Sequence, residues 1–267
     1  MVSNSADTLA KLKDIRVFIL DMDGTIYLGD KVLSGSREFI SKIKKNRRKI
    51  LYFTNNASKS KSIYLDKLKR LGYEVELSDI VTSGDVTIDF IKSNHPGQSV
   101  YLVGTPALEK SFIEAGINLT DGNQGDIVIS SFDTTLTYDK LEKACTLIRN
   151  GALFYSTHPD FNCPTETGFI PDSGAICSLI TASTGKTPRY FGKPHKESAD
   201  MMARLCNFSF DEMAMVGDRL YTDIALGKNN GILSILVLTG ETKEEDVTEE
   251  NRGDIVLEGI NDLINLV

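Results

Sequence analysis

The chain has 267 residues, of which 41% are hydrophobic and 25% are charged, fractions typical of a folded globular protein rather than a disordered one. Its 30 basic and 37 acidic residues give a net charge of −7, which disfavours general binding to the phosphate backbone of nucleic acids. Four scattered cysteines with no Cys-x-x-Cys pair indicate neither a disulfide framework nor a zinc site.

The length fits one large domain or two modest ones, at about 150 residues per domain. Residues 1–13 lack the apolar core of a signal peptide, and no run approaches the roughly 18 apolar residues of a membrane span. We therefore expect a cytoplasmic protein with no membrane partner.

Strand-like and helix-like segments alternate along the whole chain, which predicts an α/β fold of parallel strands joined by helical crossovers. The strands are expected at residues 16–20, 49–53, 99–103, 126–131, 153–156, 213–216 and 233–238. Helices are expected at residues 36–45, 60–71, 86–92, 107–115, 138–150, 174–184 and 198–206, with another that begins at Thr222. The stretch that begins near residue 83 forms a set of units that could be a domain of its own.

Polar residues follow three of the expected strands, and ligands bind beyond the carboxyl ends of strands in open parallel sheets. Asp21 and Asp23 come directly after the first strand, and Asp218 follows a later one. Carboxylates this close need a counter-ion, and a hard divalent cation such as Mg²⁺ prefers oxygen ligands. Gly24 in the same loop allows close backbone approach, and the amides of such a turn can hold an anion.

The same residues are suited to phosphoryl transfer. With a metal ion in place, one carboxylate can act as nucleophile and the other as general acid and then base. Thr54 and Asn55, after the second strand, offer a hydroxyl and an amide to phosphate oxygens. Lys193 offers the positive charge that stabilises a phosphoryl group and the Asp21 carboxylate.

Four motifs in this order carry a family resemblance that covers nearly the entire chain. They are Asp21-Met22-Asp23-Gly24-Thr25, Thr54-Asn55-Asn56, Gly192-Lys193-Pro194 and Gly217-Asp218-Arg219-Leu220-Tyr221-Thr222-Asp223. With them, the sequence resembles the phosphatases of the haloacid dehalogenase (HAD) superfamily, specifically the NagD-like branch with a type C2a cap. The resemblance implies a Rossmann-like parallel-sheet core, residues 1–82 and 189–267, and an inserted α/β cap, residues 83–188, that forms a mobile lid and selects the substrate.

The resemblance also implies roles for individual residues. Asp21 would attack phosphorus and become an aspartyl-phosphate, while Asp23 would protonate the leaving oxygen and later activate water. The Asp21 carboxylate, the backbone carbonyl of Asp23, and Asp218 would bind Mg²⁺. Gly24, Thr54, Asn55 and Lys193 would bind the phosphate, with Asp223 as an acid near the water shell of the metal. Dehalogenases and P-type ATPases of the superfamily lack an acid at the position of Asp23, so its presence favours hydrolysis of phosphate esters.

In the cap, His158-Pro159-Asp160 stands where the family often has Asn-Pro-Asp. We hypothesise that His158, Asp160 and residues 171–174 approach the leaving group of the substrate, because they follow a strand end or begin a helix. His158 departs from the usual Asn, so this motif alone does not assign a substrate from a relative. We expect small phosphomonoesters, such as sugar phosphates or related metabolites, and a monomer or homodimer.

Two other functions fit the same sequence. A phosphotransferase or mutase would form the same aspartyl-phosphate and pass it to a second hydroxyl. A non-catalytic sugar-phosphate sensor would keep the fold and use closure of the cap as a switch, although loss of Asp21 or Asp23 would be its expected signature, and both are present.

Overall fold

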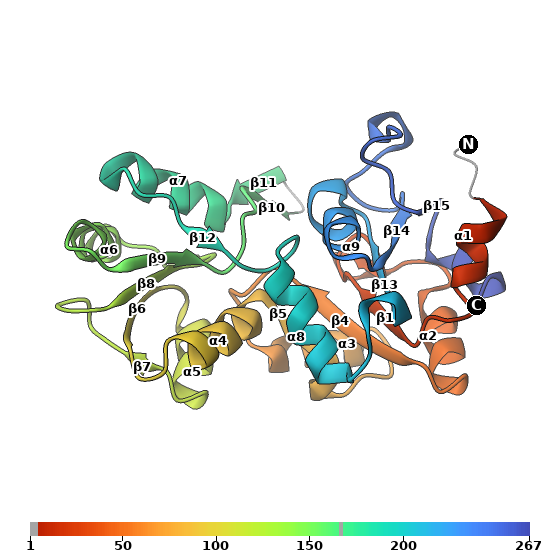
Figure 1. Cartoon of the computed structure of the whole chain (residues 1–267), viewed down its shortest axis with the longest axis horizontal. Helices are drawn as coiled ribbons and strands as arrows, with labels where there is room; N and C mark the ends of the chain where they lie inside the picture. Colours follow the sequence, from red (N-terminus) through yellow and green to blue (C-terminus); the bar gives the residue numbers. More distant parts are fainter. Residues whose placement is uncertain (1–4, 166–167) are drawn as a thin grey trace. The chain divides into compact units, whose positions relative to one another are not determined.

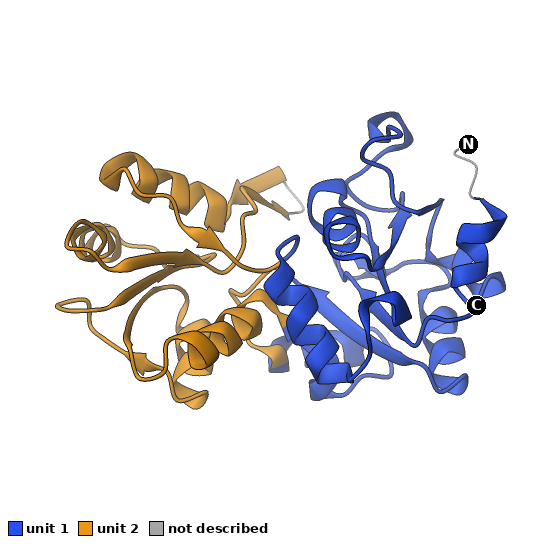
Figure 2. Ribbon diagram, in the orientation of Figure 1, with its two compact units in different colours: residues 1–54, 62–81, 193–267 blue, residues 55–61, 82–192 orange. Residues whose placement is uncertain are grey.

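The computed structural model describes residues 5–165 and 168–267, which form two compact units (Figure 2). Unit 1 comprises Met1–Thr54, Ser62–Val81 and Lys193–Val267, and unit 2 comprises Asn55–Lys61 and Thr82–Gly192. The sequence predicts that residues 1–13 contain no signal peptide. Residues 1–4 of that segment lie outside the described residues. The assignment of catalysis to one unit and substrate selection to the other stays a prediction.

Unit 1 is built on a six-stranded sheet in the order β15-β14-β13-β1-β4-β5 (Figure 1). Its strands are β1 (Val17–Leu20), β4 (Lys49–Thr54), β5 (Ile80–Thr82), β13 (Met213–Gly217), β14 (Leu233–Val237) and β15 (Ile255–Leu257). Strand β1 pairs in parallel with β13 on one side and with β4 on the other, and all four of its residues are buried. Such continuous apolar strands are typical of a parallel sheet covered on both faces. The carboxyl ends of β1, β4 and β13 therefore lie at the same edge.

Helices supply the apolar side chains that cover this sheet. They are α1 (Ala6–Lys11), α2 (Ser36–Lys45), α3 (Lys61–Arg70), α8 (Lys196–Cys206) and α9 (Ala225–Asn230). In α2 the apolar residues recur at helical spacing, and Phe39, Ile40 and Ile43 are all buried in the core. The Phe39 ring meets Phe18 of β1 edge to face, with centroids 5.4 Å apart. Helix α2 thus holds the central strand in place by direct aromatic packing.

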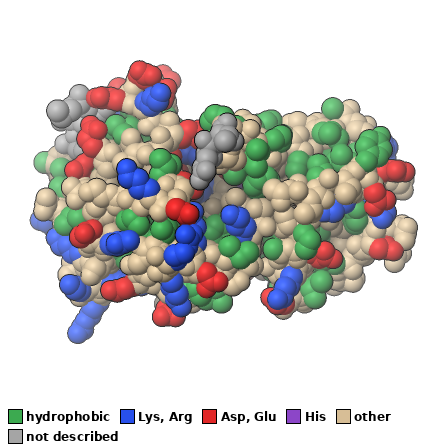
Figure 3. Space-filling view, turned by 180° about the vertical axis from the view of Figure 1, so that it is seen from behind, with side chains coloured by type: hydrophobic (Ala, Val, Ile, Leu, Met, Phe, Trp, Pro, Cys, Tyr) green, Lys and Arg blue, Asp and Glu red, His purple; other side chains and the backbone are tan. Residues whose placement is uncertain are grey.

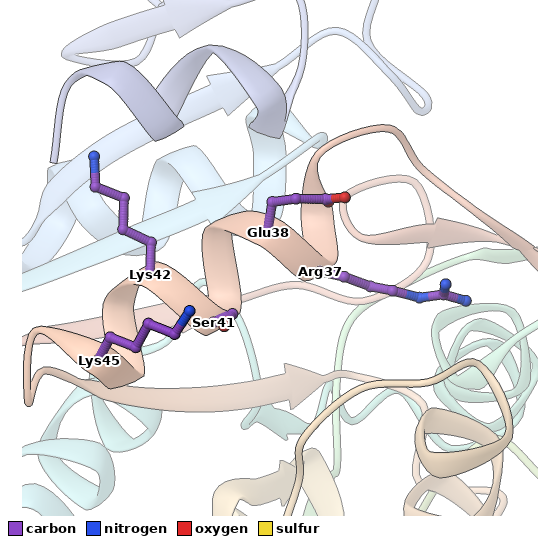
Figure 4. A pocket seen from close by; sticks show the side chains of 5 residues that line it. All are labelled: Arg37, Glu38, Ser41, Lys42 and Lys45. Carbon is purple, nitrogen blue, oxygen red and sulfur yellow. The ribbon is translucent and has the colours of Figure 1, made fainter.

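The opposite face of α2 is basic and supports neighbouring backbone. An open pocket of about 460 Å³ lies over Arg37, Glu38, Ser41, Lys42 and Lys45 (Figure 4). The side chains of Arg37 and Lys42 extend away from each other, and each donates a hydrogen bond to a backbone carbonyl elsewhere in unit 1. Lysines in the last turn also suit the negative end of the helix dipole. These contacts give Arg37 and Lys42 a structural role.

Unit 2 has its own five-stranded sheet, in the order β12-β9-β8-β6-β7, and a separate antiparallel hairpin, β10–β11. The strands are β6 (Ser99–Val103), β7 (Asn118–Leu119), β8 (Ile127–Ser130), β9 (Leu153–Ser156), β10 (Asn162–Thr165), β11 (Gly168–Pro171) and β12 (Arg189–Tyr190). Its helices are α4 (Ser83–Asn94), α5 (Pro106–Glu114), α6 (Tyr138–Arg149) and α7 (Ser173–Thr184). The expected α/β fold is confirmed, and the sheet of unit 2 is parallel as well, since the pairs among β6, β7, β8, β9 and β12 are all parallel.

Several short elements differ from the sequence prediction. Strands β5, β15 and the β10–β11 hairpin are not predicted, because three or four residues give too little periodicity to identify. Helix α4 begins at Ser83 rather than near residue 86, because Thr82 and Asp85 form a capping box that fixes its first turn. The helix expected from Thr222 is a π-helical turn, Leu220–Ile224, followed by the short α9.

The described surface carries mixed charge on the side drawn in Figure 3, where acidic and basic side chains are interspersed with apolar ones. Within residues 5–165 and 168–267, no helix combines the length and the apolar character that crossing a bilayer requires.

Candidate active site

The central feature of the site is Asp21, which comes directly after the buried strand β1. Its backbone N–H donates to Val216 O of β13 at 2.9 Å, so the strand pairing extends to this residue. The chain then turns tightly, and Met22 O accepts hydrogen bonds from the next three-residue segment, 25–27. Gly24 has a φ of +91°, a conformation that favours glycine. The sheet and this turn together fix where the Asp21 carboxylate lies.

Lys193 lies almost completely buried among acids and pairs with two of them. Its Nζ is 2.5 Å from Asp21 Oδ1 and 2.7 Å from Asp223 Oδ1, and it also donates to Phe53 O at 3.3 Å. Burial alone lowers the pKa of this ammonium, but the carboxylates of Asp21 and Asp223 outweigh burial and raise it. Lys193 is therefore held permanently charged.

The acids around Lys193 outnumber it. Oxygen atoms of Asp21, Asp218 and Asp223 lie within 4.8 Å of one another. Three carboxylates and one ammonium sum to a charge of −2. Burial, with the neighbouring carboxylates, raises the pKa of Asp21 well above its ordinary value, and burial and Asp223 raise the pKa of Asp218 to about 7. The protein alone does not balance the negative charge of this site.

A divalent cation fits this imbalance. It would neutralise the excess of two negative charges, and all three acids offer the oxygen ligands that such cations prefer. The Asp218 Oδ1 atom is buried and has no hydrogen-bond partner among the described residues, whereas Oδ2 accepts the N–H of Glu241 at 2.6 Å. A buried carboxylate oxygen without a hydrogen-bond partner in the protein is expected of a residue that binds a metal ion.

Glycines crowd the backs of these carboxylates. A Cβ at Gly240 would lie 1.9 Å from Asp218 Oδ2, and one at Gly24 would lie 2.5 Å from the same oxygen. A Cβ at Gly217 would lie 2.2 Å from Asp223 Cγ. No other residue type fits these positions without moving a carboxylate, so the glycines set the positions of the acids. The loop after β14 also supplies Thr239, whose Oγ1 donates to Gly24 O at 2.6 Å.

The predicted site residues divide between the two units. Asp21, Lys193, Asp218 and Asp223 come together in unit 1, where Thr54 ends the neighbouring strand β4. Asp23 also lies in unit 1, and its Oδ1 accepts the Gly29 N–H at 3.4 Å. The Gly24 N–H donates to Tyr27 O at 2.7 Å within the turn.

Asn55 groups with unit 2, as do the two residues expected to select the substrate. Asn55 Nδ2 donates to Asp160 Oδ1 at 3.2 Å, and His158 Nε2 lies 2.8 Å from Asp172 Oδ1. All four side chains are buried. Sequence reasoning included Asp172 only within a segment. The signal that could have identified Asp172 is its position directly before Ser173, as the N-cap of a helix.

The site also depends on residues that sequence reasoning missed. Thr239, Gly240 and Glu241 form the loop after β14 that supports Asp218 and Gly24. A polar loop after a strand of the same sheet is a usable signal, because such loops line the ligand crevice. Arg219 pairs with Glu241 at 2.9 Å, which ties this loop to the segment after Asp218.

Comparison with known proteins identifies the family. A family model described as haloacid dehalogenase-like hydrolase matches residues 18–118, and a second, described as HAD-hydrolase-like, matches residues 190–263. The chain belongs to the haloacid dehalogenase-like hydrolases. Within the HAD-like hydrolases it falls in the NagD-like subfamily and is a phosphomonoesterase with an inserted α/β cap.

Relatives of this HAD-like enzyme are phosphatases by name. Acid sugar phosphatases of Staphylococcus epidermidis and Staphylococcus aureus are each 36% identical to it, over 88% and 90% of this chain and 91% and 93% of theirs. The 4-nitrophenylphosphatase of Thermotoga maritima is 43% identical, with a TM-score of 0.92 over 96% of this chain and 98% of its own. A glycerol phosphate phosphatase of Mycobacterium tuberculosis, crystallised with calcium, is 28% identical, with a TM-score of 0.88 over 95% and 76%.

Removing the Asp218 charge should stabilise the metal-free HAD-like chain at alkaline pH. A carboxyl whose folded pKa is raised to about 7 favours the fold below its unfolded pKa of 3.8 and loses that contribution as pH rises through 7. We expect Asp218→Asn in EDTA to raise the melting temperature increasingly from about pH 5 to pH 8, by about 2–4 °C per kcal/mol gained. Circular dichroism melts measure this, with exposed Asp211→Asn as the control. A lower melting temperature than wild type at the alkaline end would contradict it.

Adding one methyl group at Gly240 should weaken metal binding. The new Cβ would meet Asp218 Oδ2 at 1.9 Å and displace it, and supporting contacts of this kind cost about 10–100-fold in metal affinity. We expect Gly240→Ala to show that loss for Mg²⁺ by calorimetric titration. Gly125→Ala is the matched control, since its nearest neighbour lies at 3.5 Å. Equal affinities in the two variants would show that the close packing on Asp218 is unimportant.

Proposed function

We propose that this enzyme is a Mg²⁺-dependent phosphatase of small phosphomonoesters, with sugar phosphates or related metabolites as substrates and an aspartyl-phosphate on Asp21 as the intermediate. The observation that carries the proposal is the position of Asp21, which follows the central strand and is paired with Lys193 beside Asp218 and Asp223. The substrate class is supported by the acid sugar phosphatases that cover about nine-tenths of the chain.

In the first half of the reaction, a carboxylate oxygen of Asp21 attacks phosphorus and the bond from phosphorus to the ester oxygen breaks. Asp23 gives its proton to that oxygen, so the product leaves as an alcohol rather than an alkoxide. Lys193, Thr54 and Asn55 bind the phosphate oxygens as negative charge spreads over them. Gly24 lies beside the bound phosphate in this proposal, and a side chain there would strike Asp218.

In the second half, Asp23 takes a proton from water, whose oxygen attacks the phosphorus of the aspartyl-phosphate. The bond from phosphorus to Asp21 breaks, which releases inorganic phosphate and restores the carboxylate. Asp23 suits both steps because it is exposed at the edge of the turn, unlike the buried acids beside it.

The metal would be held by the carboxylates of Asp21 and Asp218 and the backbone carbonyl of Asp23. When bound, it supplies charge neutralisation that lets an anionic carboxylate approach an anionic phosphate. Asp223 has a different role in this proposal. Its Oδ1 pairs with Lys193 and its Oδ2 accepts the Arg219 N–H at 3.1 Å, so it orients the lysine from behind.

We propose that the inserted unit selects the leaving group and that His158 and Asp160, both buried, take part in that selection through the residues they hold in place. Both lie in the loop between β9 and β10, and Asp172 is the N-cap of α7, directly after β11. His158→Asn, which introduces the residue common in the family, tests this on a panel of esters. Unchanged relative turnover across the panel would exclude a role for His158 in selection.

Removing the nucleophile should abolish hydrolysis. We expect phosphate release from a panel of sugar phosphates, nucleotides, pyridoxal phosphate and p-nitrophenyl phosphate to require Mg²⁺, to stop with EDTA, and to fall by at least about 10⁴-fold in Asp21→Asn. Inorganic phosphate should account for all ester consumed, since a phosphotransferase or mutase would yield a second ester instead. Metal-dependent turnover that survives Asp21→Asn would contradict the mechanism. Saturable ester binding without any turnover would support a sensor.

Removing the general acid should affect the two half-reactions differently. We expect Asp23→Asn to slow sugar phosphates by about 10²–10⁴-fold, because their alkoxides need protonation, and p-nitrophenyl phosphate less in the first step. Since Asp23 also activates water, the variant should then retain the aspartyl-phosphate. Stopped-flow measurement should show a burst of p-nitrophenol near one equivalent per chain. Equal slowing of both ester types without a burst would rule out this role.

A further inference from the structure

Unit 2 contains a buried histidine whose two ring nitrogens both face hydrogen-bond acceptors. The His158 side chain is 0% exposed. Its Nε2 lies 2.8 Å from Asp172 Oδ1, a carboxylate oxygen, so this nitrogen must carry a hydrogen. Asp172 Oδ1 also accepts the Ser173 N–H at 2.6 Å, which holds the carboxylate in place at the start of α7.

The other ring nitrogen faces two hydroxyl groups that have already donated their hydrogens. Ser83 Oγ donates to Asn55 O and lies 3.3 Å from His158 Nδ1. Thr157 Oγ1 donates to Ser131 Oγ at 2.9 Å and lies 2.9 Å from the same nitrogen. Since a hydroxyl carries one hydrogen, both oxygens can only accept from the ring. Nδ1 must therefore carry a hydrogen as well.

A histidine with hydrogens on both nitrogens is an imidazolium cation. With this assignment the ring has no lone pair to give to a metal ion, although the ligand atoms of His158, Asp160 and Asp172 lie within 4.8 Å of one another. The cation also offsets one of the two negative charges of Asp172 and Asp160, which face it from the start of α7 and from the loop after β9. On α4, which presents its N-terminus to the ring through Ser83, the nearby Asp85 is paired with Lys61 at 3.2 Å.

The same network holds Asn55 at two points. Its backbone carbonyl accepts from Ser83 Oγ, which His158 Nδ1 orients. Its side-chain amide donates to both oxygens of Asp160, at 3.2 and 3.4 Å, while a Cβ at Gly192 would lie 2.7 Å from its Oδ1. Asp160 is itself fixed, since Asp160 O accepts the Gly174 N–H at 2.8 Å.

We propose that His158 is a buried imidazolium that positions Asn55, through Ser83 on the backbone side and, on the side-chain side, through its charge on Asp160, whose carboxylate lies within 4.8 Å of the ring nitrogen. This rests on the proposed function, in which Asn55 binds the phosphate of the substrate. His158 and Asp160 are then positioning residues that influence the phosphate-binding amide without touching substrate. When the pH rises far enough to remove one proton from the ring, one ring nitrogen becomes an acceptor. That nitrogen then faces either hydroxyls that already donate to other groups or a carboxylate, and Asn55 loses its fixed orientation.

The protonation state can be tested without any activity measurement. The chain has three histidines, so long-range ¹H–¹⁵N correlation spectra contain three ring patterns, and His158→Asn identifies one by removing it. At about pH 7.5 an unperturbed histidine is about nine-tenths neutral. We expect both nitrogens of His158 to resonate as protonated at this pH. One unprotonated ring nitrogen would overturn the proposal, whether or not the chain is a phosphatase.

The positioning role is tested by a double-mutant cycle with p-nitrophenyl phosphate. We expect Asp160→Asn to raise KM about tenfold with kcat changed less than about threefold, and to add less than about twofold in an Asn55→Ala background. Additive effects would mean that Asp160 contacts the substrate itself and would overturn the positioning role. If no ester is turned over, the Kd for inorganic phosphate with Mg²⁺ replaces KM in the same cycle.

The pH dependence of KM provides a third test of the proposal. We expect KM to rise on the alkaline side in the wild type and this rise to be absent in His158→Asn. His95→Asn is the matched control, since His95 is in the same unit and its Nε2 contacts Tyr155 OH at 2.9 Å. This variant should keep the wild-type profile. A wild-type profile in His158→Asn would contradict the proposal, while Asp21→Asn tests the proposed function separately.

Discussion

The site depends on one lysine, Lys193, whose single positive charge does not neutralise the three carboxylates around it. Lys193 pairs with Asp21 and Asp223, and Asp218 adds a third carboxylate to the same buried space. Burying like charges together raises the free energy of the folded chain, and the raised pKa values of Asp21 and Asp218 express that cost. The excess negative charge favours a divalent cation and, once the cation is bound, an anionic substrate. A bound cation relieves this repulsion, so the repulsion contributes to the affinity of the site for the cation.

Such an arrangement persists only if the surrounding structure prevents relaxation. Strand β1 is buried on both sides in the middle of the sheet, and its pairing extends to the backbone of Asp21. Gly24 and Gly240 pack against Asp218 so closely that the carboxylate has no space to turn away from its neighbours. The free energy of folding that the large apolar core of unit 1 provides thus offsets the repulsion among the buried acids of the site.

The sequence was sufficient to predict the alternating α/β order and the acids of unit 1, because both depend on local patterns. Asp21 and Asp218 each follow an apolar strand, and parallel strands bring such positions to one edge. The sequence was insufficient where the partner is distant. Nothing local to Gly240 indicates that it packs on Asp218, and nothing local to Ser83 indicates that its hydroxyl joins His158 to Asn55. These contacts form only in the folded tertiary structure, and no local pattern in the sequence indicates them.

The two units differ in how they offset buried negative charge. In unit 1 the acids exceed the single cation, so the protein leaves a place for a metal ion. In unit 2 the hydrogen-bond directions around His158 supply a cation from the chain itself, and the polar atoms there have partners within the protein. A site with an unmet charge can bind and react, whereas a satisfied network can only hold its members in place. That difference is the physical reason to assign chemistry to Asp21 and positioning to His158.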